Sequence, residues 1–157
     1  MSHNEAIFKA VRNNDVSAIE SAISDNPSVL EARDDRGSTP LILASYLGHR
    51  EATKKLVESG ADLNAFAGTG TALMGVSFKG FTKLAAYLID AGADVNASDP
   101  RAANGGTALI FAAMFNRADV VDLLLERGAD AGAKDGNGLT AADNARNRGL
   151  TEIVAKL

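Results

Sequence analysis

The sequence holds few residues whose types and spacing suit catalysis or metal binding. It has two well-separated histidines, His3 and His49, and no cysteine. A thiolate nucleophile and a thiolate metal site are therefore excluded, and a zinc site would depend on carboxylates, which is uncommon. We expect no catalytic residue, no metal and no cofactor, because no nucleophile is paired with a base and a group that stabilises an oxyanion.

Glycine-rich motifs for nucleotide or acyl chemistry are incomplete or missing. The stretch GTGTAL at 68–73 begins like a dinucleotide-binding loop, but it lacks the third glycine and does not follow a strand of a βαβ unit. The chain contains no GxxxxGK(S/T) phosphate loop and no GxSxG nucleophile elbow. The sequence therefore predicts that the protein is not an enzyme.

Composition and charge narrow the function classes further. The 157 residues suffice for one domain, and 46% hydrophobic with 23% charged residues is typical of a folded globular chain. The net charge of −4 leaves no surplus for neutralising phosphates, so we expect no nucleic-acid partner. The N-terminal stretch MSHNEAIFKAVRNND has no signal-peptide core and no window suits a membrane span, so we expect no membrane partner and a cytoplasmic location.

One phrase recurs along the chain and indicates repeated structural units. It reads ESGADLNA at 58–65, DAGADVNA at 90–97 and ERGADAGA at 126–133. Four threonines recur at similar intervals, each after a glycine-bearing loop and before a short apolar run: Thr39, Thr71, Thr107 and Thr140. Successive threonines lie 32, 36 and 33 residues apart. Intervals of this length are typical of stacked repeats.

Each repeat is predicted to form two helices. A threonine before an apolar run is typical of a helix N-cap, so the first helix of each pair should begin at 40, 72, 108 and 141. The second helix should end at Gly60, Gly92 and Gly128, because glycine adopts the left-handed conformation that closes a helix most easily. The Asp and Asn that follow are then turn residues without a chemical role.

This pattern resembles the ankyrin repeat. The stretches GSTPLILASYLGH at 37–49 and LIDAGADVNAS at 88–98 are similar to the family's GxTPLHxAA and LLxxGADVNA. The resemblance implies an all-α fold, an ankyrin-repeat solenoid of stacked helix-turn-helix units joined by β-turn or hairpin loops. It also implies a single domain, 1–157, with a degenerate or capping N-terminal repeat at 1–33, central repeats at 34–66, 67–98 and 99–133, and a C-terminal capping repeat at 134–157.

One position departs from the family's pattern. The histidine that follows TPL in the family is replaced here by Ile42, Met74, Ile110 and Asp143. Without the hydrogen bonds that this imidazole makes in the family, packing should supply the stability. The resemblance also places His49 and the acidic pair Asp34 and Asp35 at turn positions, where a structural role is expected.

The resemblance further implies where a partner would bind. In ankyrin proteins the residues after the small residues of the first helix, together with the loop tips, contact partners on the concave face. The positions carried over are mostly aromatic, apolar or cationic: Arg12, Arg36, Tyr46, Leu47, Phe66, Phe78, Lys79, Arg101, Met114, Phe115 and Arg148. Aromatic residues, Met and Arg are enriched in the cores of interfaces, so these positions form the predicted binding site.

Two alternatives remain open for these residues. The aromatic side chains Tyr46, Phe66, Phe78 and Phe115 either form an exposed binding stripe or fold onto the next repeat and complete the core. Arg101 lies in the long loop 98–106, which is either a contact element or a tolerated surface insertion.

The sequence thus predicts a non-catalytic module that binds a partner protein through its concave face and thereby masks, inhibits or scaffolds it. Because repeats account for the whole chain, binding itself would be the function. The alternative is a self-associating structural protein that uses the same apolar stripe, although we expect a monomer before a homo-oligomer. A small-ligand carrier would need a closed pocket, which a single layer of helix pairs rarely forms.

Overall fold

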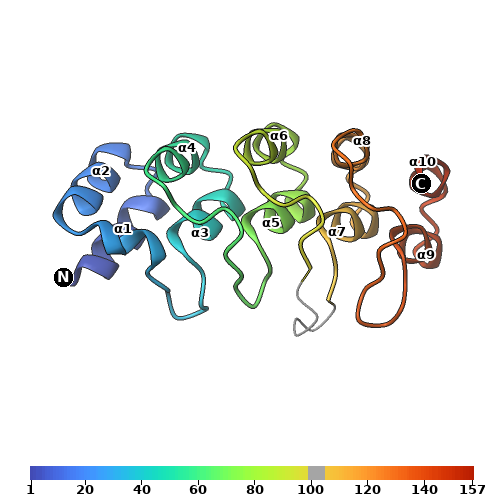
Figure 1. The fold of residues 1–157 in the computed structure, drawn as a ribbon, viewed down its shortest axis with the longest axis horizontal. Coiled ribbons are helices and arrows are strands. Elements are labelled where there is room, and N and C mark those ends of the chain that lie inside the picture. Colours follow the sequence, from blue (N-terminus) through green and yellow to red (C-terminus); the bar gives the residue numbers. More distant parts are fainter. Residues whose placement is uncertain (99–104) are drawn as a thin grey trace. The chain divides into compact units, whose positions relative to one another are not determined.

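The computed structural model describes residues 1–98 and 105–157 (Figure 1). These residues form two compact units, Met1–Ala72 and Leu73–Leu157. Regular secondary structure in these residues is helical, apart from one isolated antiparallel bridge between Ala67 and Gly70. Each unit is built from pairs of short antiparallel helices. The predicted all-α repeat fold is confirmed.

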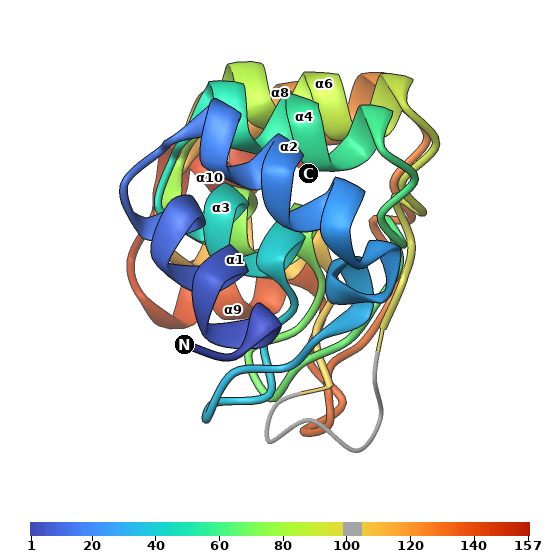
Figure 2. The same ribbon diagram turned by 90° about the vertical axis from the view of Figure 1, so that its left-hand side faces the viewer.

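The first unit contains two helix pairs and a short 3₁₀ helix. Its elements are α1 (His3–Arg12), α2 (Val16–Asp25), η1 (Pro27–Glu31), α3 (Pro40–Tyr46) and α4 (Arg50–Glu58). We call the first helix of each pair its A helix and the second its B helix. The A helices α1 and α3 pack against each other, and so do the B helices α2 and α4, which gives the unit two layers (Figure 2).

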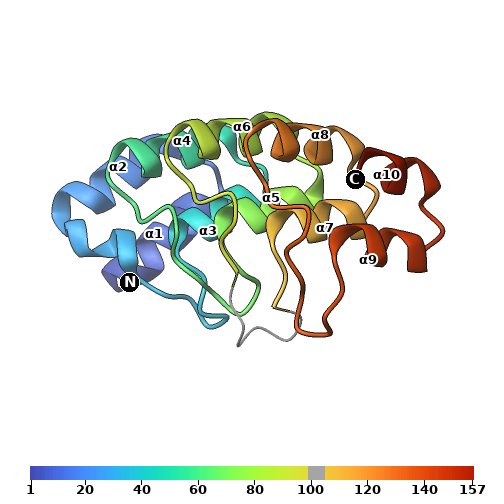
Figure 3. The same ribbon diagram turned by 45° about the vertical axis from the view of Figure 1, so that its right-hand side comes forward.

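The second unit repeats this arrangement. Its elements are α5 (Ala72–Lys79), which begins at the boundary residue, α6 (Thr82–Asp90), α7 (Ala108–Met114), α8 (Ala118–Glu126), α9 (Ala141–Asn147) and α10 (Thr151–Lys156). The A helices α7 and α9 pack side by side, and the B helix α8 lies between α6 and α10 in the other layer (Figure 3). The boundaries between individual repeats stay a prediction.

Threonine side chains begin three of the A helices, as the sequence predicts. The hydroxyls of Thr39, Thr107 and Thr140 accept hydrogen bonds from the amides of Ile42, Ile110 and Asp143 at 3.2, 3.3 and 3.2 Å. Each hydroxyl satisfies an amide that a helix start otherwise leaves unpaired. The A helices α3, α5, α7 and α9 begin at residues 40, 72, 108 and 141, which confirms the predicted starts.

Glycine in the left-handed region follows the end of three B helices. The φ angles of Gly60, Gly92 and Gly128 are +96°, +115° and +88°, so the predicted helix ends are confirmed. In the turns that follow, an aspartate side chain accepts from the amide two residues later at 2.9 Å in all three repeats, for example Asp62 from Asn64. The recurring acidic phrase is therefore a structural element.

Alanine fills the centres of α3, α7 and α9 and lies near the end of α1. Ala10 is 3% exposed, and Ala44, Ala112 and Ala145 are fully buried. A methyl side chain lets neighbouring helices approach closely, so these small residues set the distance between repeats. Larger apolar residues from both layers fill the space around them, including Ile7, Leu56, Leu109 and Leu124.

Removing one N-cap hydroxyl should test how much these helix starts contribute. We expect Thr39→Ala to lower the free energy of unfolding by about 1 kcal/mol, because the Ile42 amide loses its acceptor. Thr39→Ser keeps the hydroxyl and should retain most of that stability. Urea denaturation followed by circular dichroism measures both values; an equal loss in the two variants would contradict the capping role.

Candidate functional site

Large apolar side chains are exposed at the end of α3. Tyr46, its last residue, and Leu47, its C-cap, are 39% and 40% exposed, and among the described large hydrophobic residues only Met1 is also exposed. Arg12 ends α1 nearby, since His49 Nε2 lies 3.2 Å from the Arg12 carbonyl oxygen. The structure thus brings together Arg12, Tyr46 and Leu47, which we call the first-unit patch.

The other predicted residues of the first unit, Arg36 and Phe66, lie in loops away from this patch. Arg36 precedes α3 and Tyr46 ends it, so a helix of seven residues, about 10 Å long, separates them. Phe66 is half-buried, and its carbonyl oxygen accepts a hydrogen bond from Arg33. Arg33 also donates to the Gly37 carbonyl at 2.8 Å and so ties the two loops together. Sequence reasoning missed Arg33, because a lone arginine in a loop carries no pattern.

In the second unit, the ends of the A helices bring two rings and an arginine together. Phe78 and Phe115 pack edge to face, with ring centroids 4.5 Å apart and planes at 73°. The guanidinium carbon of Arg148 lies 5.2 Å from the centroid of the Phe115 ring. We call Phe78, Phe115 and Arg148 the aromatic cluster.

The aromatic cluster combines packing between repeats with partial exposure. Both rings are half-buried, as is the predicted residue Met114 at the end of α7, and Arg148 is exposed. The rings therefore stabilise the contact between neighbouring helix pairs and also reach the surface. Their role in binding a partner stays a prediction.

A second cationic position lies beside the aromatic cluster. Arg117, the N-cap of α8, donates from Nε to the Phe78 carbonyl oxygen at 2.9 Å. The predicted residue Lys79 is exposed at the end of α5, and its Nζ lies 6.0 Å from the centroid of the Phe81 ring. Lys79 and Arg117 line a surface pocket of about 300 Å³ between the turns of two helix pairs, together with residues that include Asp119.

Arg117 occupies the same position in its repeat as His49 does in the first unit. Each residue is the N-cap of a B helix. Each side chain reaches a carbonyl oxygen near the end of the A helix in the preceding repeat, which is α1 for His49 and α5 for Arg117. This contact agrees with the structural role expected for His49. Sequence reasoning missed Arg117, because the basic residue in each of the aligned turns GHR and NRA is visible in the sequence but the carbonyl oxygen that it contacts is not.

Arg101 lies outside the described residues. Across residues 1–98 and 105–157, no group of three or more His, Asp or Glu side chains is placed to hold a metal ion. No helix in this part of the chain is long and apolar enough to cross a membrane.

Comparison with known proteins agrees with the repeated phrase and the helix pairs. A family model described as ankyrin repeats in three copies matches residues 2–67 and 66–135. The chain belongs to the ankyrin-repeat family. The resemblance seen in the sequence is confirmed.

Three relatives share these ankyrin repeats. The chain is 40% identical over 142 residues, 90% of its length, to the E3 ubiquitin-protein ligase hecd-1 of Caenorhabditis elegans, of which it covers 4%. It is 31% identical over 154 residues, 98% of its length, to XBAT34 of Arabidopsis thaliana, of which it covers 32%. It is 32% identical over 59 residues, 38% of its length, to ankyrin repeat domain-containing protein 29 of Danio rerio, of which it covers 20%. The chain thus spans less than a third of the length of each relative.

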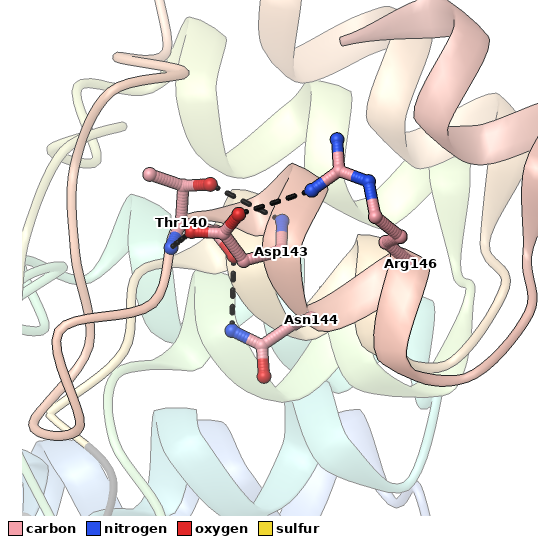
Figure 4. A network of polar contacts seen from close by, with 4 residues as sticks. All are labelled: Thr140, Asp143, Asn144 and Arg146. Atoms are coloured by element: carbon pink, nitrogen blue, oxygen red, sulfur yellow. Dashed lines mark hydrogen bonds and ion pairs between the residues drawn. The ribbon is translucent and has the colours of Figure 1, made fainter.

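Where ankyrin repeats carry a histidine, the last repeat carries Asp143, which helps to begin α9 (Figure 4). The Thr140 amide donates to Asp143 Oδ2 at 3.0 Å, and Arg146 pairs with Asp143 Oδ1 at 3.1 Å. The hydrogen bonds from Thr140 and Arg146 hold the pKa of Asp143 below its usual value. The expectation that packing alone compensates for the missing imidazole is therefore incomplete, because a reciprocal cap stabilises this helix.

A buried carboxylate holds the loop before α9. Asp135 accepts from the Asn137 and Leu139 amides at 2.9 and 3.0 Å and from Asn144 Nδ2 at 3.0 Å. Burial raises the pKa of Asp135, but the hydrogen bonds from Asn144, Leu139 and Asn137 outweigh burial, so the pKa lies below its usual value. This carboxylate therefore fixes the approach to α9.

We expect Asp135→Ala to lower the free energy of unfolding by about 1–3 kcal/mol at neutral pH, because two backbone amides and Asn144 lose their acceptor. The folded pKa lies below the unfolded one, so the stabilisation is complete above about pH 4 and is lost as the pH falls through the folded pKa. Urea denaturation at neutral and acidic pH should show a difference between wild type and variant that shrinks on acidification.

Asp130→Ala is the matched control for this prediction. Asp130 is exposed, and its side chain accepts from the Gly132 amide at 2.9 Å. Its removal should cost less than the removal of Asp135. A difference between wild type and Asp135→Ala that stays constant from neutral to acidic pH would show that the ionised carboxylate is not the stabilising group.

Proposed function

We propose that this chain binds another protein, without catalysis, through residues at the C-terminal ends of its A helices. Ankyrin repeats are generally protein–protein interaction modules. The observation that supports the choice of surface is the exposure of Tyr46 and Leu47, two adjoining large apolar side chains. Adjoining apolar residues in water favour an interaction site, because their burial against a partner is stabilising.

The first-unit patch has the chemistry of a small interface core with a polar edge. Tyr46 offers a ring with a hydroxyl group, Leu47 an aliphatic side chain, and Arg12, at the end of the neighbouring helix α1, is an exposed cationic residue. Buried aromatic anchors of this kind contribute about 2 kcal/mol or more to binding when measured by truncation. We therefore assign Tyr46 the largest share of the binding free energy in this patch.

The effect on the partner protein comes from covering part of its surface. A bound repeat surface masks, inhibits or scaffolds the protein that it covers, and we place this binding in the cytoplasm. The name of the Caenorhabditis elegans relative describes an E3 ubiquitin-protein ligase, of which this chain covers 4%. We assign no ligase activity to the chain, and limit its role to holding a partner.

Self-association is a second candidate, and the same exposure of Tyr46 and Leu47 favours it. In that case the first-unit patch would pair with its own copy. Size-exclusion chromatography with light scattering distinguishes the two candidates. We expect a mass of one chain, 16.2 kDa, at all concentrations; a rise with concentration that Tyr46→Ser abolishes would support self-association instead.

The double variant Tyr46→Ser, Leu47→Ser tests the proposed surface. We expect it to lose a partner that the wild-type chain captures from a cell lysate, because the apolar anchors are gone. The partner is identified by mass spectrometry, and the affinity of the purified pair is then measured. Since both side chains are partly exposed, circular dichroism should show the helicity of wild type.

Val57→Ser, on the B helix α4, is the control for a general loss of apolar surface. Val57 is half-buried on the other layer of the unit, and its variant should bind the partner as wild type does. If the double variant folds and binds the partner with unchanged affinity, the first-unit patch is not the binding surface.

A further inference from the structure

Three cations gather at the ends of helices in the second unit. Lys79 ends α5, Arg117 precedes α8 and Arg148 follows α9, and all three side chains are exposed. In the described part of the chain, no ion pair includes Arg117 or Arg148, whereas Arg127 at the end of α8 pairs with Asp90. The chain as a whole carries a net charge of −4, so this local group of cations differs in sign from the average charge of the chain.

Contact with the Phe115 ring leaves Arg148 able to bind a carboxylate. A guanidinium that lies over a ring keeps its N–H donors around its own edge. The planar fork of these donors matches the two oxygens of a carboxylate. Because the Phe115 ring restricts the side chain of Arg148, less conformational freedom is lost when a ligand binds.

The pocket beside the cluster offers a second position for a carboxylate. Arg117 bonds the Phe78 carbonyl through Nε, which leaves its two terminal nitrogens as donors at the pocket. Lys79 lines the same pocket of about 300 Å³. Asp119 also lines it, so the pocket suits a singly charged carboxylate and opposes a densely charged phosphate group.

We propose that the second unit binds an acidic segment of a partner protein, with one carboxylate held by Arg148, a second held by Lys79 and Arg117, and an apolar side chain packed on the aromatic cluster. This proposal rests on the proposed protein-binding function and names the chemistry of the partner. Negative charge elsewhere on the chain repels an acidic segment, so the three cations determine where it docks.

The same observations favour a peptide over a nucleic acid. A base would stack on a ring face, and Arg148 already lies over one face of the Phe115 ring. Three cations neutralise few phosphates, and the net charge of −4 opposes a polyanion. A short segment with carboxylates on both sides of an apolar residue would use both the cations and the rings.

Selection of a random peptide library displayed on phage against the whole chain supplies the probe. We expect the selected peptides to carry Asp or Glu on both sides of an apolar residue. Arg148→Gln and Arg117→Gln should each weaken the binding of such a peptide about tenfold, because each removes charge-assisted hydrogen bonds. Fluorescence anisotropy of the labelled peptide measures affinity, and Arg127→Gln, in the same unit, is the control that should leave it unchanged.

Charge reversal keeps the test decisive where a variant alters folding. Arg148→Glu should lose the acidic peptide and gain a counterpart in which lysine replaces one acidic residue, which misfolding cannot mimic. A neutral or basic consensus, no selected peptide, or unchanged affinity in both glutamine variants would overturn the acidic-partner proposal. Binding of a single-stranded oligonucleotide that Arg148→Gln abolishes would also overturn it.

These results are separable from the proposed function. One outcome is that peptides or captured proteins are lost with Tyr46→Ser, Leu47→Ser but not with Arg148→Gln. In that case the proposed protein-binding function stands and the acidic site is rejected. A captured partner that neither set of variants affects would instead contradict the proposed surfaces of both units.

Discussion

Close packing of short A helices through alanine is the constraint on which the rest of this structure depends. Ala44, Ala112 and Ala145 are fully buried, and their methyl groups let neighbouring backbones approach. These positions of α3, α7 and α9 therefore have no room for a large side chain. Tyr46 and Phe115 stand at helix ends instead, where Tyr46 is exposed and Phe115 is half-buried.

Polar contacts between neighbouring repeats complement this packing. Within the first unit, His49 contacts the carbonyl of Arg12, and the Asn14 side chain accepts from the Ala52 amide at 3.1 Å. Within the second unit, Arg117 bonds the Phe78 carbonyl, and Asn96 accepts from the Asp130 amide at 2.8 Å. These side chains satisfy backbone groups that helix ends and turns leave unpaired. Each repeat therefore depends on its neighbour for hydrogen bonds as well as for burial.

The sequence predicted the elements that local chemistry determines. A threonine before an apolar run and a glycine after one act within a single turn, so the starts at Pro40 and Ala108 and the end near Gly60 were readable. Contacts over more than 30 residues were not readable from spacing, and Arg33 and Arg117 were missed because their acceptors are carbonyl oxygens, which every residue has. The candidate site was predicted by position, but which of its residues lie together within each unit required the structure.

Hydrogen–deuterium exchange of the chain, alone and with a captured partner protein, tests the central claim most directly. If the ends of the A helices bind, exchange should slow around residues 46–49 or 115–118, and it should remain unchanged along the B helices α4 and α8. Protection confined to the B helices, with the ends of the A helices exchanging as in the free chain, would contradict the account.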